Sequence, residues 1–159
     1  MVVPMTDVDQ SGLSPAMAAA VFDERVRRFG HLLEVFTKLE RALDAALQES
    51  VGIPHAWFEV LERIASAPDQ QLTMTDLGRR LALTSGGVTR FLDSIVDAGY
   101  IARAKSPTDR RATLARLTDH GWTTLAAALT VHNAVIEQLL EPLTDRERDT
   151  LDHTLLKLL

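Results

Sequence analysis

The chain has 159 residues, of which 46% are hydrophobic and 25% charged, and its formal net charge is −5 at pH 7; this composition is typical of a globular protein rather than a disordered one. No apolar run approaches the roughly 20 residues that a membrane span needs, and no signal peptide is evident, so a cytoplasmic protein is expected. The chain has no cysteine, which excludes disulfides, thiolate metal sites and cysteine-based redox sensing.

The N-terminal third predicts a flexible tail followed by one long helix. Residues 1–13 contain a proline, a glycine and several polar residues, and residues 14–50 carry apolar side chains at three- and four-residue steps, which predicts a helix over about 14–48. A helix of this length cannot bury its apolar stripe against a small domain alone, so we expect it to pack against a partner as a dimerisation helix.

Three shorter helices are predicted next. Gly52 and Pro54 break the long helix, and an apolar pattern then predicts a second helix to about residue 67. Thr73 and Asp76 form a capping box that opens a short helix over 74–81. Thr84 is the expected N-cap of a third helix, which runs to about residue 98 and ends at a glycine.

A hairpin and two more helices complete the chain. Residues 100–103 and 112–117 are short enough for strands, and the polar loop between them contains Pro107. Thr118 is the expected N-cap of a helix to about residue 140, and Thr144 opens the last helix. The predicted fold is mainly α with a small β-hairpin wing: a winged helix-turn-helix domain over 51–117, with dimerisation helices at 14–50 and 118–159.

Charge is distributed unevenly along the sequence. Residues 79–116 contain eight basic and three acidic side chains, giving 8 − 3 = +5, so the rest of the chain carries −5 − 5 = −10. A basic island on an acidic body is typical of a DNA-binding surface, although ordinary charge scatter is the alternative.

The order helix, turn, helix, basic hairpin predicts contacts with double-stranded DNA. A helix that enters a major groove about 12 Å wide needs small or polar residues at its entrance. The third helix offers such residues, and Arg90 can pair with a guanine edge or a phosphate. The wing would place Arg110 or Arg111 near the minor groove, with Arg103 and Lys105 on backbone phosphates; a solvated arginine pair is the alternative. The recognition-helix candidates are Thr84, Ser85, Gly86, Gly87, Thr89 and Arg90.

Residues 57–121 closely resemble the MarR family of bacterial winged-helix transcription regulators. The matching stretches are 57–61, 72–78, 83–90, 98–103 and 106–112, followed by Leu114 and 117–121. The resemblance implies a homodimer built from the first helix and the last two, on a roughly palindromic, AT-containing operator. It also implies that Asp109, Arg110 and Arg111 hold the wing, with an arginine in the minor groove, and that Ser85, Gly87, Thr89 and Arg90 contact DNA.

Two positions depart from the family pattern. A basic residue is usual a few positions after the Thr-Arg pair, where this chain has Ser94 beside Asp93. Its loss removes one expected positive charge, so a modest affinity or an unusual operator is expected. Gly78 stands where alanine is commoner, which costs about 1 kcal/mol in a helix interior.

The resemblance also implies an effector pocket for a small aromatic or phenolic anion. Phe29, His31, Trp57 and Phe58 are the candidate residues, and plain core packing of these aromatics is the alternative. Such a protein would be a ligand-responsive repressor, and a protein-interaction module that keeps the fold without specific DNA binding is the rival interpretation.

Other chemistry finds little support in the residues. The histidines 120, 132 and 153 have no i, i+4 spacing that would favour a metal site. Glu137 and Glu141 lie one helical turn apart, but ordinary surface charge is the simpler interpretation. No P-loop, nucleophile elbow or dinucleotide fingerprint occurs, so neither a cofactor nor an enzymatic activity is expected.

Overall fold

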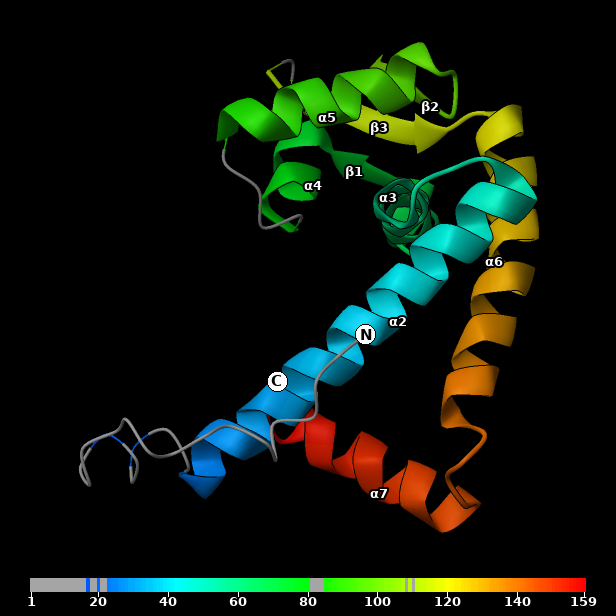
Figure 1. Ribbon diagram of the computed structural model, residues 1–159. Coiled ribbons are helices and arrows are strands. Elements are labelled where there is room, and N and C mark those ends of the chain that lie inside the picture. Colours follow the sequence, from blue (N-terminus) through cyan, green and yellow to red (C-terminus); the bar gives the residue numbers. More distant parts are fainter. Residues whose placement is uncertain (1–16, 18–19, 21–22, 81–84, 108, 110) are drawn as a thin grey trace. The chain divides into compact units, whose positions relative to one another are not determined.

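The computed structural model describes residues 17, 20, 23–80, 85–107, 109 and 111–159 (Figure 1). The predicted tail 1–13, the predicted helix start at residue 14, Thr84 and Arg110 lie outside these residues. Residues 1–39 form one compact unit and residues 40–159 form another. The division falls inside the long helix, and the functional boundaries at residues 50 and 117 stay predictions.

The described elements confirm the predicted fold class, a mostly helical chain with a small antiparallel sheet. The helices are α2 (Glu24–Val51), α3 (His55–Ala65), the short η2 (Pro68–Gln70), α4 (Met74–Arg80), α5 (Ser85–Asp97), α6 (Asp119–Leu140) and α7 (Asp145–Leu156). The strands are β1 (Gln71–Thr73), β2 (Ile101–Lys105) and β3 (Thr113–Leu117).

Two glycines and a proline set the helix limits. Gly52 adopts a left-handed φ of 78°, and its N–H donates to the Leu47 carbonyl at 3.0 Å, which closes α2 three residues beyond the predicted end at 48. Pro54 is the N-cap of α3. Gly99, with a φ of 80°, ends the turn after α5 as predicted. A residue with a Cβ would be strained at both glycines.

Threonines cap three helices, as the sequence predicts. The hydroxyl oxygens of Thr73 and Thr118 each accept a backbone N–H at 3.0 Å, from Asp76 and Gly121 respectively. At α7 the Glu147 carboxylate accepts from both the hydroxyl and the N–H of Thr144, at 2.7 and 2.8 Å. These bonds favour the charged carboxylate and lower the pKa of Glu147.

The sheet has three strands in the order β1-β3-β2, where the sequence predicts only the hairpin. No element was predicted for residues 71–73, which form the third strand. Leu72 of β1 lies opposite Ala115 of β3, and both are buried. A strand of three residues is too short to show an alternating pattern, so only its pairing with β3 reveals it.

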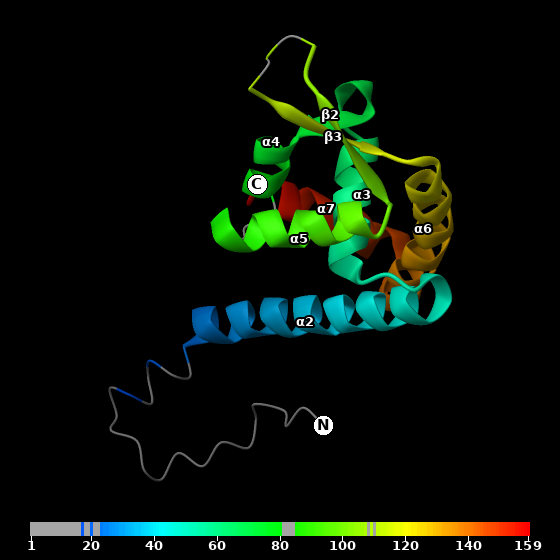
Figure 2. The same cartoon turned by 90° about the horizontal axis from the view of Figure 1, so that it is seen from above.

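The core of the 40–159 unit lies between α3, α5 and the sheet, and the β2–β3 hairpin extends beyond it (Figure 2). α3 supplies the largest share of the core and contacts both α6 and β3. The buried cluster comprises Leu47, Ile53, Phe58, Val60, Leu61, Ile64, Leu72, Leu77, Leu92, Ile95, Ile101, Ala115, Leu117, Leu125 and Ala128.

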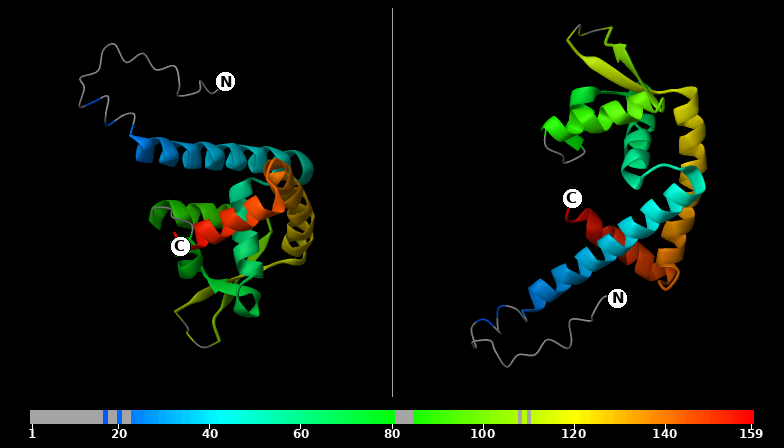
Figure 3. Two further views of the ribbon diagram at one scale, coloured as in Figure 1. Left: turned by 90° about the horizontal axis from the view of Figure 1, so that it is seen from below. Right: turned by 45° about the horizontal axis from the view of Figure 1, so that its top comes forward.

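α6 leaves the sheet and α7 folds back from its far end (Figure 3). Arg148 of α7 fixes this corner, because its guanidinium donates to the Leu140 carbonyl at 3.0 Å and to the Glu137 carboxylate at 2.8 Å. Glu137 is an exposed acid in an ion pair, and Glu141 is exposed. The arginine thereby adds a second donor to a carbonyl at the C-terminal end of α6, where the helix dipole favours a positive charge.

The start of α6 meets the turn after α5 at one close contact. A Cβ on Gly121 would lie 2.1 Å from the Tyr100 carbonyl oxygen, which belongs to the backbone. The same oxygen accepts the N–H of Thr118 at 3.1 Å. Only a glycine lets the first turn of α6 approach the sheet this closely.

Gly121→Ala is therefore expected to destabilise the protein by about 3 kcal/mol, because the added methyl group forces backbone apart. In an open helix the same change would stabilise by up to about 1 kcal/mol, so the sign identifies the contact. Urea unfolding followed by circular dichroism measures it. Thr123→Ala, at an exposed position two residues further along α6, is the control and should change stability by less than about 0.5 kcal/mol. An unchanged or raised stability in Gly121→Ala would contradict the contact.

Candidate nucleic-acid interface

The solvent-exposed face of α5 carries mostly small side chains. Gly87, Thr89 and Arg90 are exposed, while Leu92 and Ile95 on the opposite face are buried. Ser85 is the first residue of α5 and Gly86 follows it. The helix therefore presents small and polar residues, with one arginine among them, as a helix entering a major groove requires.

The wing loop is held by a compact turn. The Asp109 N–H donates to the Ser106 hydroxyl at 3.2 Å, and the Asp109 carboxylate accepts the N–H of Arg111 at 2.9 Å. Backbone bonds between Ser106 and Ala112, and between Ala112 and Asp109, close the loop at 3.1 and 3.0 Å. The turn leaves Arg111 exposed at the tip of the hairpin.

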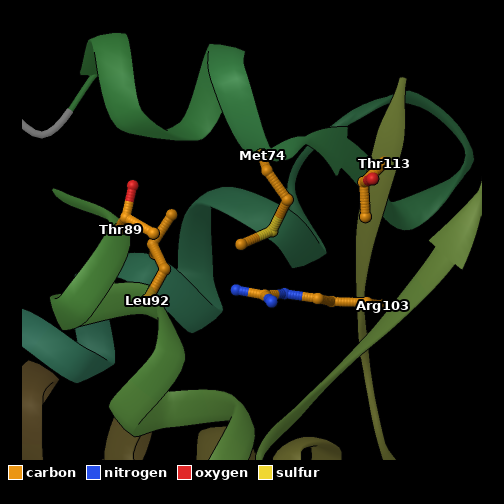
Figure 4. A pocket seen from close by; sticks show the side chains of 5 residues that line it. All are labelled: Met74, Thr89, Leu92, Arg103 and Thr113. Carbon is orange, nitrogen blue, oxygen red and sulfur yellow. The ribbon is translucent and has the colours of Figure 1, made fainter. Parts of the chain in front are cut away.

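The wing and α5 lie at the same end of the 40–159 unit (Figures 1 and 2). Arg103 of β2 forms an ion pair with Asp93 of α5. Arg103 and Thr89 also line one cavity of about 230 Å³, together with Met74, Leu92 and Thr113 (Figure 4). The structure thus brings together the predicted residues Thr89 and Arg103, while Lys105, Asp109 and Arg111 lie further out along the hairpin.

Asp93 is the site residue that sequence reasoning missed. A signal was present, since Arg103 follows the inward-facing Ile101 by two positions, and alternate residues of a strand share a face. The Arg103 side chain therefore extends toward α5 while staying partly exposed, and an acid on that helix can pair with it. Its predicted phosphate contact stays a prediction.

The candidate effector residues have separate surroundings. Phe58 is buried and stacks on His132 with the ring centroids 4.5 Å apart. Trp57 is half-buried and meets Tyr100 edge-on at 5.6 Å. Phe29 and His31 are exposed residues of the 1–39 unit. The four residues therefore belong to two units, two on each.

A buried histidine that the sequence did not single out ties α3 to α2. The ring of His55 lies with its Nδ1 3.3 Å from a Glu40 carboxylate oxygen, and its backbone N–H donates to Asp44 at 2.9 Å. Asp44 and Glu40 thereby hold the first turn of α3. Among the residues that the structure describes, no group of three or more acids and histidines could hold a metal ion. Nor is any described helix both long and apolar enough to cross a bilayer.

Comparison with known proteins connects this arrangement to transcription regulators. The sequence model of the MarR family matches residues 51–112. The chain is 30% identical to the HTH-type transcriptional regulator YkoM of Bacillus subtilis, over 81% of this chain and 84% of YkoM. It is 29% identical to the HTH-type transcriptional regulator MhqR of the same organism, over 73% of this chain and 81% of MhqR.

Solved structures give the same result. A mutant MarR from Escherichia coli complexed with operator DNA superposes with a TM-score of 0.74 and 28% identity, over 90% of this chain and 98% of that chain. Wild-type MarR of the same organism in its apo form superposes with a TM-score of 0.69 and 30% identity, over 82% and 96% of the two chains.

Asp109→Ala is expected to loosen the wing turn without unfolding the domain, because it removes the carboxylate that accepts the Arg111 N–H. Limited trypsin digestion measures the effect, since trypsin cuts after the arginines of this loop. Cleavage at the wing should become several times faster while the urea midpoint barely moves. Asp152→Ala, an exposed acid on α7, is the control. Equal cleavage rates in the two variants and wild type would contradict the role of Asp109.

Proposed function

Because the chain belongs to the MarR family of transcriptional regulators, we propose that it is a ligand-responsive repressor that binds a pseudo-palindromic operator as a homodimer. It is a DNA-binding regulator rather than an enzyme. The observation that carries the proposal is the pairing of the open α5 face with the turn that exposes Arg111, both at one end of the 40–159 unit.

DNA contacts are assigned by the shape of each element. The small residues at the start of α5 would let the helix enter the major groove, where Thr89 and Arg90 read base edges. Arg111 at the wing tip would lie in the minor groove, and Lys105 would contact a phosphate. Two such units related by a two-fold axis would place their recognition helices about 34 Å apart, in successive major grooves.

Exposed apolar surface supports a homodimer. In the 1–39 unit, Phe29 and Phe36 are 60% and 57% exposed, and four more large apolar residues of α2 are about half-exposed. In the 40–159 unit, α7 exposes Leu151, Leu155 and Leu156. Contiguous apolar patches of this kind mark protein–protein contacts, and a second copy of the chain is the occupant that we propose.

A small aromatic or phenolic anion is favoured as the effector by the family resemblance, with Phe29, His31, Trp57 and Phe58 as candidate contacts. The burial of Phe58 and its stacking on His132 agree equally with a purely structural role for that residue.

One observation favours the rival interpretation of a protein-interaction module. The recognition helix carries one arginine and two aspartates, Asp93 and Asp97, and therefore has a net negative charge. A helix with this charge is repelled by phosphates unless other residues compensate. Absence of binding to any duplex at low salt would favour the interaction module over the regulator.

Phe36→Glu should convert the dimer to monomer, because it places a charge in the exposed apolar stripe of α2. Sedimentation velocity measures the shift as a dissociation constant raised at least tenfold. Lys38→Gln, which makes the same change of one charge unit on the polar side of the helix, is the matched control and should stay dimeric. A dimeric Phe36→Glu would remove α2 from the proposed interface.

Arg90→Ala and Arg111→Ala test the DNA contacts. In vitro selection from random duplexes first identifies the operator preferred by the wild type, and fluorescence anisotropy then gives affinities across a range of salt concentrations. Arg111→Ala should weaken binding to all sequences and reduce the slope of log K against log salt by about one. Arg90→Ala should weaken binding by about 1–3 kcal/mol and change the selected sequence.

The control for both variants is Arg146→Ala, since Arg146 is an exposed arginine on α7. It should bind as the wild type does. Variants of Arg90 and Arg111 that both keep wild-type affinity and slope would overturn the contact assignment.

A further inference from the structure

Beyond the core, Arg103 of the wing and Asp93 of α5 form an ion pair that connects the two elements. We propose that Asp93 is a positioning residue, which holds the recognition helix and the wing at a fixed separation through Arg103. This inference rests on the proposed function, and it deepens it by naming the residue that determines whether helix and wing can engage DNA together.

The register of the sheet directs Arg103 inward. Ile101 and Ala115 are buried on the face of the sheet that covers the core. Arg103 lies directly opposite Ala115, and cross-strand partners share a face. Because Ala115 is small, the arginine side chain can extend over it toward α5, as Figure 4 shows.

The pair lies beside a cavity that the apolar side chains of Met74 and Leu92 line without filling. Arg103 lines the cavity of about 230 Å³ between α5 and the hairpin, with Leu92 on the α5 side and Thr113 on the wing side. The cavity leaves the packing between the two elements incomplete at this point. The ion pair with Asp93 crosses from one element to the other and constrains their separation there.

The exposure of the Asp93–Arg103 pair favours a role in positioning the wing over a role in stabilising the fold. The two side chains are 42% and 41% exposed, and exposed ion pairs add little to the free energy of unfolding. Removing the pair should therefore leave the fold intact while widening the range of wing positions. Two elements that must enter adjacent grooves at once lose affinity when their relative position is no longer fixed.

If only the negative charge of Asp93 mattered, its removal would have the opposite effect on DNA binding. Asp93 lies one turn beyond Thr89 on α5, so its carboxylate is close to the proposed DNA-facing surface. If the aspartate only repelled phosphates, its neutralisation would tighten binding. If it positions the wing, the same change weakens binding to the operator. The two explanations differ in sign.

The experiment compares Asp93→Asn with Asp97→Asn in the full-length dimer. Both variants remove one negative charge from α5, and Asp97 is exposed one turn further along. The probes are the duplex selected by the wild type, about 30 base pairs long to hold two half-sites, and a random-sequence duplex. Asp93→Asn should weaken selected-duplex binding at least tenfold with no loss on random duplex, whereas Asp97→Asn should bind both probes as tightly as wild type or tighter.

Arg103 gives a second readout that a phosphate contact would not share. Arg103→Gln should weaken operator binding like Asp93→Asn yet leave the salt slope unchanged, unlike Arg111→Ala. The exchanged pair Asp93→Arg with Arg103→Asp should recover most of the affinity. Tighter operator binding by Asp93→Asn, or a slope reduced by about one in Arg103→Gln, would overturn the proposal.

A measurement without DNA separates this inference from the proposed function. Hydrogen exchange of the β2 and β3 amides should accelerate in Asp93→Asn and Arg103→Gln but not in Asp97→Asn. Unchanged hydrogen-exchange rates in all three variants would overturn the positioning role of the Asp93–Arg103 pair. Failure of the wild type to select any duplex would instead overturn the DNA-binding proposal. The exchange rates alone would then show whether the Asp93–Arg103 pair fixes the position of the wing.

Discussion

The Tyr100 carbonyl is the point on which the DNA-binding half depends. It accepts the N–H of Thr118 at 3.1 Å, and Gly121 packs against it without a side chain. The Thr118 hydroxyl donates to the Gly99 carbonyl at 2.6 Å and accepts the N–H of Gly121. The end of the recognition helix, both wing strands and the start of α6 are therefore joined through backbone groups. Backbone polar groups in such a junction must be paired, so the four segments cannot move independently at this point.

Away from that junction, constraint on the wing weakens with distance. At the base of the hairpin, Ile101 and Leu117 are paired and buried in the core. Arg103 comes two residues later, where a cavity replaces packing and the contact with α5 is an ion pair. At the tip, Asp109 organises the loop through local hydrogen bonds with Ser106 and Arg111. The wing thus has three successive levels of support, hydrophobic, electrostatic and local, and among the described residues the middle level links it to α5 beyond the core.

Sequence reasoning succeeded where a local pattern carries the information. Gly99, Thr73 and Thr118 end or cap helices through chemistry that is visible within four residues, and the structure confirms each one. β1 was missed because three residues hold no periodicity, and its partner β3 lies more than forty residues away. The Asp93–Arg103 pair was missed for a related reason, since it depends on the register between strands and on how α5 crosses them. Phe58 illustrates a third limit of sequence-based prediction. An aromatic side chain in a helix can equally be part of the core or a contact to a ligand, and the sequence does not distinguish the two.

Because the chain is acidic, the proposed DNA binding would depend more on the relative position of α5 and the wing than on the number of basic residues. The net charge is −5, and α5 itself is net negative. Charges separated by more than about 8 Å are largely screened at physiological salt, so most of the acidic body has little influence on bound phosphates. Asp93 lies on α5 itself, so its charge is too close to the proposed DNA contacts to be screened by salt. With Arg103 engaged by Asp93, the basic residues left among the proposed DNA contacts that the structure describes are Arg90, Lys105 and Arg111. A small set of proposed contacts supports specific binding only when all can form together. An acid on α5 that holds the wing in place would then favour the proposed operator complex rather than oppose it.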